Sequence, residues 1–239
     1  MNKVIIIIPT YNEDQNISIL LRKLDKLRIK KKIIIVDDSN NDLTKKSIKS
    51  SKIKNIYIKR VNKKGRGSAV IHGIKKMINK TKNNDLIVEM DADLSHNPNE
   101  LINNIKYFKE KNLDLLISSR YLNKSKILNW DHNRKILSKM SNFLAHIVLQ
   151  VPVSDYTNGY RIYSRRAAQL ISKKCGKIGD GFIILSEILL CIYKMNYKID
   201  EVPTIFVNRV RGSSNVNLIL IFQSLLGLIR LFLYKNRYN

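Results

Sequence analysis

Cysteine is scarce in this chain of 239 residues, and its scarcity excludes two kinds of protein. Cys175 and Cys191 are the only two, and they form neither a CxxC pair nor the spacing of a set of metal ligands. A disulfide scaffold and a zinc finger are therefore excluded, and a reducing compartment is indicated. The apolar run over residues 4–8 ends at Pro9 and is too short for the core of a signal peptide. We expect the protein to stay on the cytosolic side.

Acidic residues are the second scarcity. The chain has 19 Asp and Glu against 44 Lys and Arg, which gives a formal net charge of +25. Such an excess favours an anionic partner, namely nucleic acid, an acidic membrane surface or a phosphorylated substrate. Isoleucine, lysine and asparagine supply 93 of the 239 residues, and their AT-rich codons offer a different origin for the charge. No recognisable nucleic-acid-binding module accompanies the charge, so nucleic acid is not the expected partner.

Linkers rich in glycine or proline are absent, so we expect one main domain over residues 1–215. Short β-branched runs without alternation are typical of strands buried on both faces, and here they alternate with segments of helical period. The strand-like runs cover residues 4–8, 33–36, 55–58, 86–90, 113–118, 198–202 and 205–207, and the helical ones include 17–27, 101–108, 134–150, 164–174 and 182–194. The pattern predicts an α/β fold with a mostly parallel sheet, helices on both faces, and ligands bound where strands end.

No apolar stretch reaches the roughly 18 residues of a clear transmembrane helix. The segment over residues 218–233 is interrupted by Gln223, Ser224 and Arg230, and Lys235 and Arg237 follow it. An apolar helix that ends in aromatic and basic anchors is typical of a membrane interface. We therefore predict a membrane-associating helix over residues 216–239. Packing of this helix on the sheet or on a partner chain is the alternative.

Two aspartates follow the predicted strand at residues 86–90. Asp91 and Asp93 stand at the ligand-binding end of the sheet, where both carboxylates can reach one hard divalent cation. Such a cation would stabilise a diphosphate as a leaving group. A helix cap or a solvated loop is the alternative interpretation of the pair alone.

Other strand exits carry groups that suit a nucleotide. Tyr11 can stack on a base, and Glu13 and Asp38 can accept hydrogen bonds from a base or a ribose. Gly65 and Gly67 open a predicted helix and allow its backbone N–H groups to approach a ligand closely. Their spacing fits neither GxGxxG nor a P-loop, which argues against a dinucleotide site and a P-loop ATPase.

Together these motifs resemble those of family 2 glycosyltransferases of the GT-A fold, and among them the polyprenyl-phosphate mannosyltransferases. The matching segments are residues 9–13 (PTYNE), 36–44 (VDDSNNDLT), 60–73 (RVNKKGRGSAVIHG), 91–98 (DADLSHNP), 119–121 (SRY), 155–161 (DYTNGYR) and 201–214 with its EVP, Arg209 and GSS. DADLSHNP is the most specific of them. The resemblance runs nearly end to end and implies a Rossmann-like GT-A domain over residues 1–215.

The resemblance also implies roles for single residues. The residues that would hold the guanosine of GDP-mannose are Pro9, Tyr11, Glu13, Val36 and Asp38. Those at the diphosphate would be Asp91, Ala92 and Asp93, with Asp91 and Asp93 as ligands of Mg²⁺ or Mn²⁺. Donor phosphates would meet Arg120 and Arg209, and the acceptor phosphate would meet Arg120 and Arg134. The implied catalytic residues are Asp93, Arg120 and Arg134.

The implied reaction is the metal-dependent, inverting transfer of mannose from GDP-mannose to dolichyl (polyprenyl) phosphate. The resemblance places it at the cytosolic face of a membrane, that of the endoplasmic reticulum in a eukaryotic cell. The protein would be peripheral or monotopic, with small membrane-anchoring subunits as further partners. Two alternatives remain: a related enzyme that takes glucose or another sugar from a UDP-sugar, and a catalytically inactive regulatory subunit.

Five positions depart from the family motifs. Leu43 replaces the glycine of DGT, Arg66 the leucine of GLG, and Ser118 the glycine of GSRY. Leu185 replaces the glutamine of a Gln-x-Glu pair, and Asn215 replaces a lysine. The missing lysine removes a cation expected near the donor phosphates, which puts the affinity and the identity of the donor at issue.

Overall fold

The computed structural model describes residues 3–61, 65–179, 181, 183–209, 211, 218–234 and 238, and for residues 218–225 it describes the backbone alone. The strands are β1 (Val4–Thr10), β2 (Lys31–Asp37), β3 (Ile56–Lys59), β4 (Leu86–Glu89), β5 (Leu115–Ser119), β6 (Lys126–Leu128), β7 (Arg161–Ser164), β8 (Ile199–Pro203) and β9 (Ile205–Val207). The helices are α1 (Ile17–Asp25), α2 (Leu43–Ser50), α3 (Arg66–Met77), α4 (Leu101–Glu110), α5 (His132–Leu149), α6 (Arg165–Lys174), α7 (Ile183–Lys194) and α8 (Leu218–Leu233).

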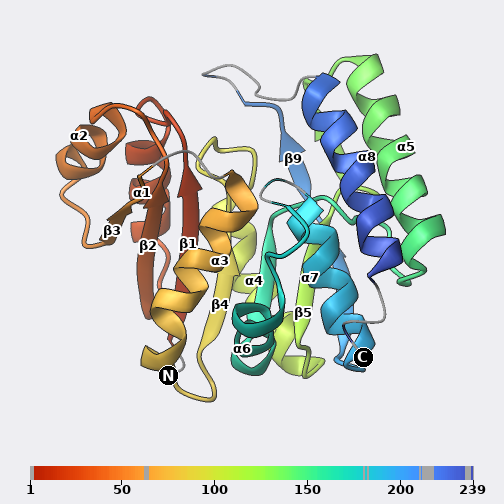
Figure 1. Ribbon diagram of the computed structural model, residues 1–239. Coiled ribbons are helices and arrows are strands. Elements are labelled where there is room, and N and C mark those ends of the chain that lie inside the picture. The colour runs from red at the N-terminus through yellow and green to blue at the C-terminus, as the bar shows by residue number, and fades with distance from the viewer. Residues whose placement is uncertain are drawn as a thin grey trace.

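Seven strands form one sheet in the order β3-β2-β1-β4-β7-β5-β8, and β6 pairs with β9 in a separate ladder. Neighbours in the large sheet are parallel, except that β7 runs antiparallel to both β4 and β5. The predicted α/β class with a mostly parallel sheet is confirmed. Since β1, β2 and β4 are parallel, their carboxyl ends meet at one edge, the upper one in Figure 1.

Helices cover both faces of this sheet (Figure 1). Every residue of β1 is buried, and successive side chains enter two different cores. Ile5 and Ile7 share a core with residues of α3, α6 and α7, whereas Ile6 and Ile8 share one with residues of α1 and α4. Burial on both faces explains why residues 4–8 read as a continuous apolar run.

β7 is absent from the predicted strands because it is short and begins with a charged residue. Arg161 is fully buried, and its guanidinium donates hydrogen bonds of 2.7–2.9 Å to the carbonyls of Tyr156, Asn158 and Leu185. These acceptors replace the water that a buried arginine loses, so a charge is tolerated inside the sheet. An antiparallel strand begins at the edge where its neighbours end. The loop before β7 therefore lies at the edge where β1, β2 and β4 end.

α5 and α8 lie side by side at the right of Figure 1, and α8 also packs on α7. Asp131 caps α5 by accepting a hydrogen bond from the Arg134 N–H at 2.7 Å, and the helix ends at Gln150 in the left-handed region. Of the helix predicted over residues 216–239, the structure describes Leu218–Leu233 as a helix, α8. In the part of the chain that the structure describes, no helix combines the length and the apolar character needed to cross a bilayer.

Both of these helices expose apolar side chains. On α5 and α8 the exposed residues are Ile136, Leu137, Met140, Phe143, Leu144, Ile147, Leu226, Ile229, Phe232 and Leu233. We call this set the α5–α8 apolar surface. The exposed residues of α5 recur at helical spacing, so they form one stripe along it.

Candidate active site

The loop after β4 holds the two aspartates of the DADLSHNP segment. The Asp91 N–H donates to His96 Nδ1 at 3.1 Å, and the Ser95 N–H donates to Asp93 Oδ1 at 3.1 Å. Leu94 lies between them at φ 66°, in the left-handed region that a residue with a branched side chain rarely adopts. These bonds hold a strained turn that places both carboxylates at the edge of the sheet.

Each of these two carboxylates pairs with an arginine from a distant segment. Arg66, the first residue of α3, lies with its Nε 2.6 Å from Asp91 Oδ1. Arg209, which follows β9, lies with its Nη2 3.0 Å from Asp93 Oδ2. Burial alone would raise the pKa of Asp91, but the charge and the hydrogen bond of Arg66 hold it below its usual range. The Asp91 carboxyl is therefore ionised at neutral pH.

A third carboxylate, that of Glu13, joins them from the loop after β1. Its side chain accepts a hydrogen bond from Asn16 Nδ2 at 2.8 Å. Burial, together with the charges of Asp93 and Asp91, raises the pKa of Glu13 to about 7, although the Asn16 bond and the charge of Arg209 oppose the rise. Glu13 thus changes its charge near neutral pH.

The residues expected at the nucleoside lie at the exits of β1 and β2. Pro9 and Val36 are opposite each other in the parallel register, and both are buried. The Val36 side chain packs in the core beside Gly73, so only its backbone can face a ligand at the edge. The Tyr11 hydroxyl is partly exposed and accepts from Asn40 Nδ2 at 3.4 Å.

Asp38 is also an ion-paired residue. Arg60 directs its Nε at Asp38 Oδ1 at 2.5 Å, and the same guanidinium donates to Ser68 Oγ at 3.0 Å and to the Gly65 carbonyl at 3.1 Å. This arginine links the exit of β2 to the first turn of α3. Asp38 therefore lies beside the amino end of a helix, where backbone N–H groups favour an anion.

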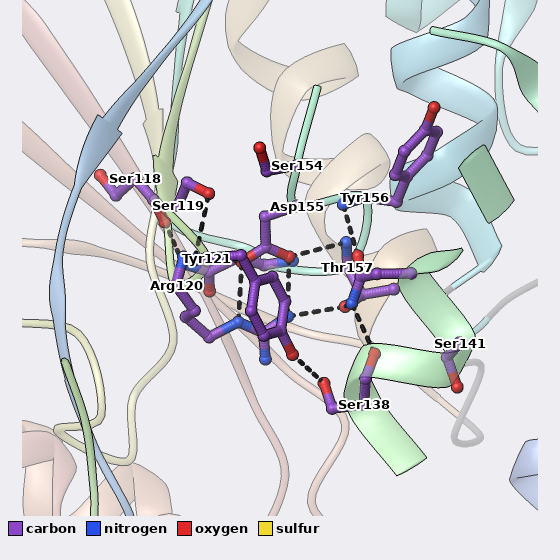
Figure 2. Close-up of polar contacts among 12 residues, drawn as sticks. Ser118, Ser119, Arg120, Tyr121, Ser138, Ser141, Ser154, Asp155, Tyr156 and Thr157 are labelled. Carbon is purple, nitrogen blue, oxygen red and sulfur yellow. Dashed lines mark hydrogen bonds and ion pairs between the residues drawn. The ribbon is translucent and has the colours of Figure 1, made fainter. Parts of the chain in front are cut away.

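Arg120 is buried and holds a carboxylate with two of its nitrogens. Arg120 Nε and Nη2 lie 2.8 and 2.7 Å from the two oxygens of Asp155, and Nη2 also donates to Thr157 Oγ1 at 2.7 Å. Figure 2 shows these contacts. The charge of Asp155 raises the pKa of Arg120 despite its burial. The loop before β7 is thus fastened to the exit of β5 by a bidentate ion pair.

Arg134 and Trp130 lie next to this pair. The Arg134 guanidinium is 4.4 Å from the centre of the Trp130 ring, and that of Arg120 is 5.5 Å from it. Arg134 Nη1 also donates to Asn208 Oδ1 at 2.9 Å. Burial and the charge of Arg209 lower the pKa of Arg134. Two cations on one indole make a positively charged, aromatic wall beside Asp93 and Arg209.

The structure brings the predicted residues together in two groups. Asp91, Asp93, Glu13 and Arg209 form the first, and Arg120 and Arg134 form the second. Ala92 is buried between the two aspartates. The GSS segment and Asn215 lie outside the described residues.

The roles of these predicted site residues in a reaction stay predictions.

Glu187 is the glutamate that remains of the Gln-x-Glu pair. It is fully buried and accepts hydrogen bonds from the Gly176 and Lys177 N–H groups and from the Tyr238 hydroxyl.

Several partners of these residues are not among the predicted site residues. These partners include Arg60, Glu89 and Asp155. For each of them the sequence gives only a weak indication of a role at the site. Arg60 and Asp155 open motif segments, and Glu89 is an acid inside an otherwise apolar strand. A buried acid needs a cationic or hydrogen-bonding partner, but the sequence does not show which one.

The side chains of the β4 exit fit a hard divalent cation. Asp91 and Asp93 supply carboxylate oxygens, and the nearby Ser95 Oγ is buried without a hydrogen-bond partner among the described residues. Mg²⁺ and Mn²⁺ take such oxygen ligands and complete their shell with water and substrate phosphate. A protein cage of three or more His, Cys, Asp or Glu side chains is not found in the described part of the chain.

The chain is similar to known proteins over most of its length. A profile described as "Glycosyl transferase family 2" matches residues 5–171. The chain is 35% identical to a dolichol-phosphate mannosyltransferase of Pyrococcus furiosus, over 98% of this chain and 64% of that protein. It therefore spans just under two thirds of that relative's length. It is also 30% identical to an undecaprenyl-phosphate mannosyltransferase of Micrococcus luteus, over 90% of this chain and 88% of that protein.

A solved structure supports the fold. The mannosyltransferase PcManGT of Pyrobaculum calidifontis, in complex with GDP-Man and Mn²⁺, superposes with a TM-score of 0.59 at 16% identity. The match covers 88% of this chain and 58% of that one. At such identity the similarity bears on the fold alone, and the predicted GT-A fold is confirmed.

Proposed function

Since the chain belongs to glycosyl transferase family 2 and is a glycosyltransferase, we propose that it moves mannose from GDP-mannose to a polyprenyl phosphate such as dolichyl phosphate. The observation that carries the proposal is the convergence of Asp91, Asp93, Glu13 and Arg209 at one edge of the sheet. Carboxylates for a cation and an arginine for phosphate are what a nucleotide diphosphate sugar requires. Both curated relatives are named for mannosyl transfer to a polyprenyl phosphate.

The donor's nucleoside would lie at the exits of β1 and β2. Tyr11 offers a ring for the base, and the Glu13 carboxylate can accept hydrogen bonds from guanine N–H groups. Asp38 would face the ribose while Arg60 keeps it in place. The diphosphate would then reach Arg209 and the two aspartates. A bound Mg²⁺ or Mn²⁺ would supply charge that stabilises GDP as the leaving group.

The acceptor phosphate would lie at Arg120, Arg134 and the Trp130 ring. Its oxygen is already anionic, so attack on the sugar carbon needs no strong general base. The residues have to align the two substrates and screen their phosphates from each other. One in-line displacement breaks the bond from the sugar carbon to the diphosphate oxygen and forms the bond to the acceptor oxygen, which inverts the sugar carbon.

The polyprenyl chain would leave this site toward the α5–α8 apolar surface. An open pocket of about 390 Å³ lies between α5 and the loop before β7, lined by Tyr121, Lys139, Asn142, Phe143, His146, Val153 and Ser154. It adjoins the Arg120–Asp155 pair through Tyr121 and Ser154 (Figure 2). Exposed apolar residues beyond it would enter the headgroup region of a membrane, which makes the protein peripheral.

The test is a panel of nucleotide sugars with dolichyl phosphate and Mn²⁺ or Mg²⁺. We expect mannosyl lipid from GDP-mannose and a loss of at least about 100-fold in Asp93→Asn, since a group at the developing charge is worth that much. Asp25→Asn, at the exposed end of α1, is the matched control and should keep full activity.

The panel also separates the alternatives. Transfer from a UDP-sugar alone would replace the proposed donor and keep the reaction class. Absence of transfer from every donor would overturn the proposal. If calorimetry then showed no donor binding by the folded protein, an inactive regulatory subunit would be the better description.

A further inference from the structure

Arg66 is a cation built into the DADLSHNP site. It stands where the matching family motif has leucine, and its side chain is only 14% exposed. Its Nε lies 2.6 Å from Asp91 Oδ1, its Nη1 donates to Glu89 Oε1, and its Nη2 donates to the Gly159 carbonyl at 3.3 Å. All three nitrogens of the guanidinium are thus engaged, and a lysine could not reproduce this fork.

Glu89 is a second, buried partner of the Arg66 guanidinium. Its side chain is buried at the end of β4, and it also accepts a hydrogen bond from the Tyr163 hydroxyl at 2.7 Å. A buried carboxylate is costly unless it is paired, and Arg66 supplies the pair. Arg66 therefore neutralises Glu89 and occupies one oxygen of Asp91 with the same side chain.

We propose that Arg66 is a resident cation of the active site, which screens Asp91 permanently and weakens the binding of a divalent cation at the Asp91–Asp93 pair. The inference rests on the proposed role of these aspartates as the cation and diphosphate site. A divalent ion that uses Asp91 meets a guanidinium within a few ångströms, and like charges at that distance repel strongly. The donor diphosphate, in contrast, finds a positive charge in the site before any metal binds.

A substitution at Gly159 is a second way to displace the Arg66 guanidinium. A Cβ at this position would lie 1.8 Å from Arg66 Nη2, so alanine there requires the tip of the arginine to move. The tip is the far end of a flexible side chain, and it can swing away from Glu89 and Asp91 while the backbone keeps its place. Gly159→Ala is thus expected to disturb the screening only when residue 66 is arginine.

The experiment measures Mn²⁺ binding to the full chain by calorimetry and by the electron paramagnetic resonance signal of free Mn²⁺, with and without GDP. Arg66→Leu alone leaves Glu89 buried and unpaired, so the test uses Arg66→Leu with Glu89→Gln. This double variant keeps the net charge of the cluster and removes the group on Asp91. We expect it to bind Mn²⁺ at least tenfold more tightly than the wild type.

Two controls accompany the double variant. Arg22→Leu removes the charge of an exposed arginine in the last turn of α1, at the end of that helix away from the site, and should leave Mn²⁺ binding unchanged. Arg66→Lys retains the charge and should bind Mn²⁺ no more tightly than the wild type.

Equal or weaker Mn²⁺ binding by the double variant, including no binding by either protein, would overturn the inference. The measurement of Mn²⁺ binding needs no sugar transfer. Failure of this inference can therefore be distinguished from failure of the proposed function.

Discussion

Within the described residues, four carboxylates at the edge where the parallel strands end each pair with an arginine. The pairs are Asp38 with Arg60, Asp91 with Arg66, Asp93 with Arg209, and Asp155 with Arg120. A phosphate that binds one of these arginines competes with the carboxylate already there. In the proposed function, substrate binding at this edge would be an exchange of anionic partners, which would favour phosphates that can take two N–H donors at once.

Among the described residues no arginine holds Glu13 in this way, and the charge of Glu13 depends on pH. Its pKa is raised to about 7, above the ordinary value of a glutamate, so the neutral form is favoured in the folded protein. Its contribution to the free energy of unfolding is fully present below about pH 4.5 and is lost as the pH rises through about 7. Glu13→Gln should match the wild type in acid and exceed its stability by up to about 3 kcal/mol at pH 8.

Urea unfolding of both proteins at pH 4, 6 and 8 measures this difference. Glu110→Gln, at the exposed end of α4, is the control. A difference between Glu13→Gln and the wild type that stays constant over the three pH values would contradict the expectation.

At the scale of elements, β7 decides which loops reach the site. The parallel strands deliver their carboxyl ends to the edge, as the apolar runs and the motifs after them predict. β7 runs the other way, so it delivers the loop before it, which carries Asp155, Thr157 and Gly159. The expectation that ligand-binding residues follow the end of each strand therefore does not identify these three residues, which precede a strand.

The α5–α8 apolar surface is the second feature at this scale. The sequence predicts a membrane-facing helix at α8 but not the contribution of α5, whose apolar stripe resembles that of a helix packed in a core. In the structure Phe143 is 64% exposed, and Met140 and Ile147 are exposed on the same face. Replacing Met140, Phe143 and Ile147 by glutamine should lower partition into vesicles at least tenfold, because three apolar side chains would no longer leave water.

Vesicle flotation measures this partition, and thermal unfolding verifies the fold of the triple variant. Ile102→Gln with Met195→Gln removes exposed apolar residues elsewhere and should leave partition intact. Unchanged flotation of the triple variant would show that α5 does not contribute to membrane binding.

At the scale of the molecule, the sequence carries a formal net charge of +25. Lys135, Lys139 and Arg230 belong to the two helices that carry the apolar surface. We expect binding to vesicles with anionic lipid to fall at least tenfold between about 0.1 and 1 M NaCl, as the screening length shortens from about 10 Å to about 3 Å. Binding to neutral vesicles should not fall with salt. If binding to anionic and to neutral vesicles depended equally on salt, the positive charge of the protein would have no role in membrane binding.

Much of the fold follows from the sequence, but only part of the site does. Buried strands and their exits place Asp91, Asp93 and Glu13 on one edge, because parallel topology leaves no other arrangement. The partners of these residues depend on tertiary contacts. Arg209 reaches Asp93 across 116 positions, and Arg120 uses two nitrogens on Asp155. Long side chains select such partners only once the chain has folded, and no spacing in the sequence encodes them.

The contact of Arg66 with Glu89 and Asp91 also constrains how this chain could have changed over evolutionary time. An arginine that appears first at position 66 finds Asp91 as a partner, whereas a glutamate that appears first at position 89 has, among the described residues, the Tyr163 hydroxyl but no cation. The arginine is thus the easier first step. Once both are present, Arg66 cannot revert alone without leaving the buried Glu89 without its cation, whereas Glu89 can revert while Arg66 keeps Asp91, so loss of the pair has to begin at position 89.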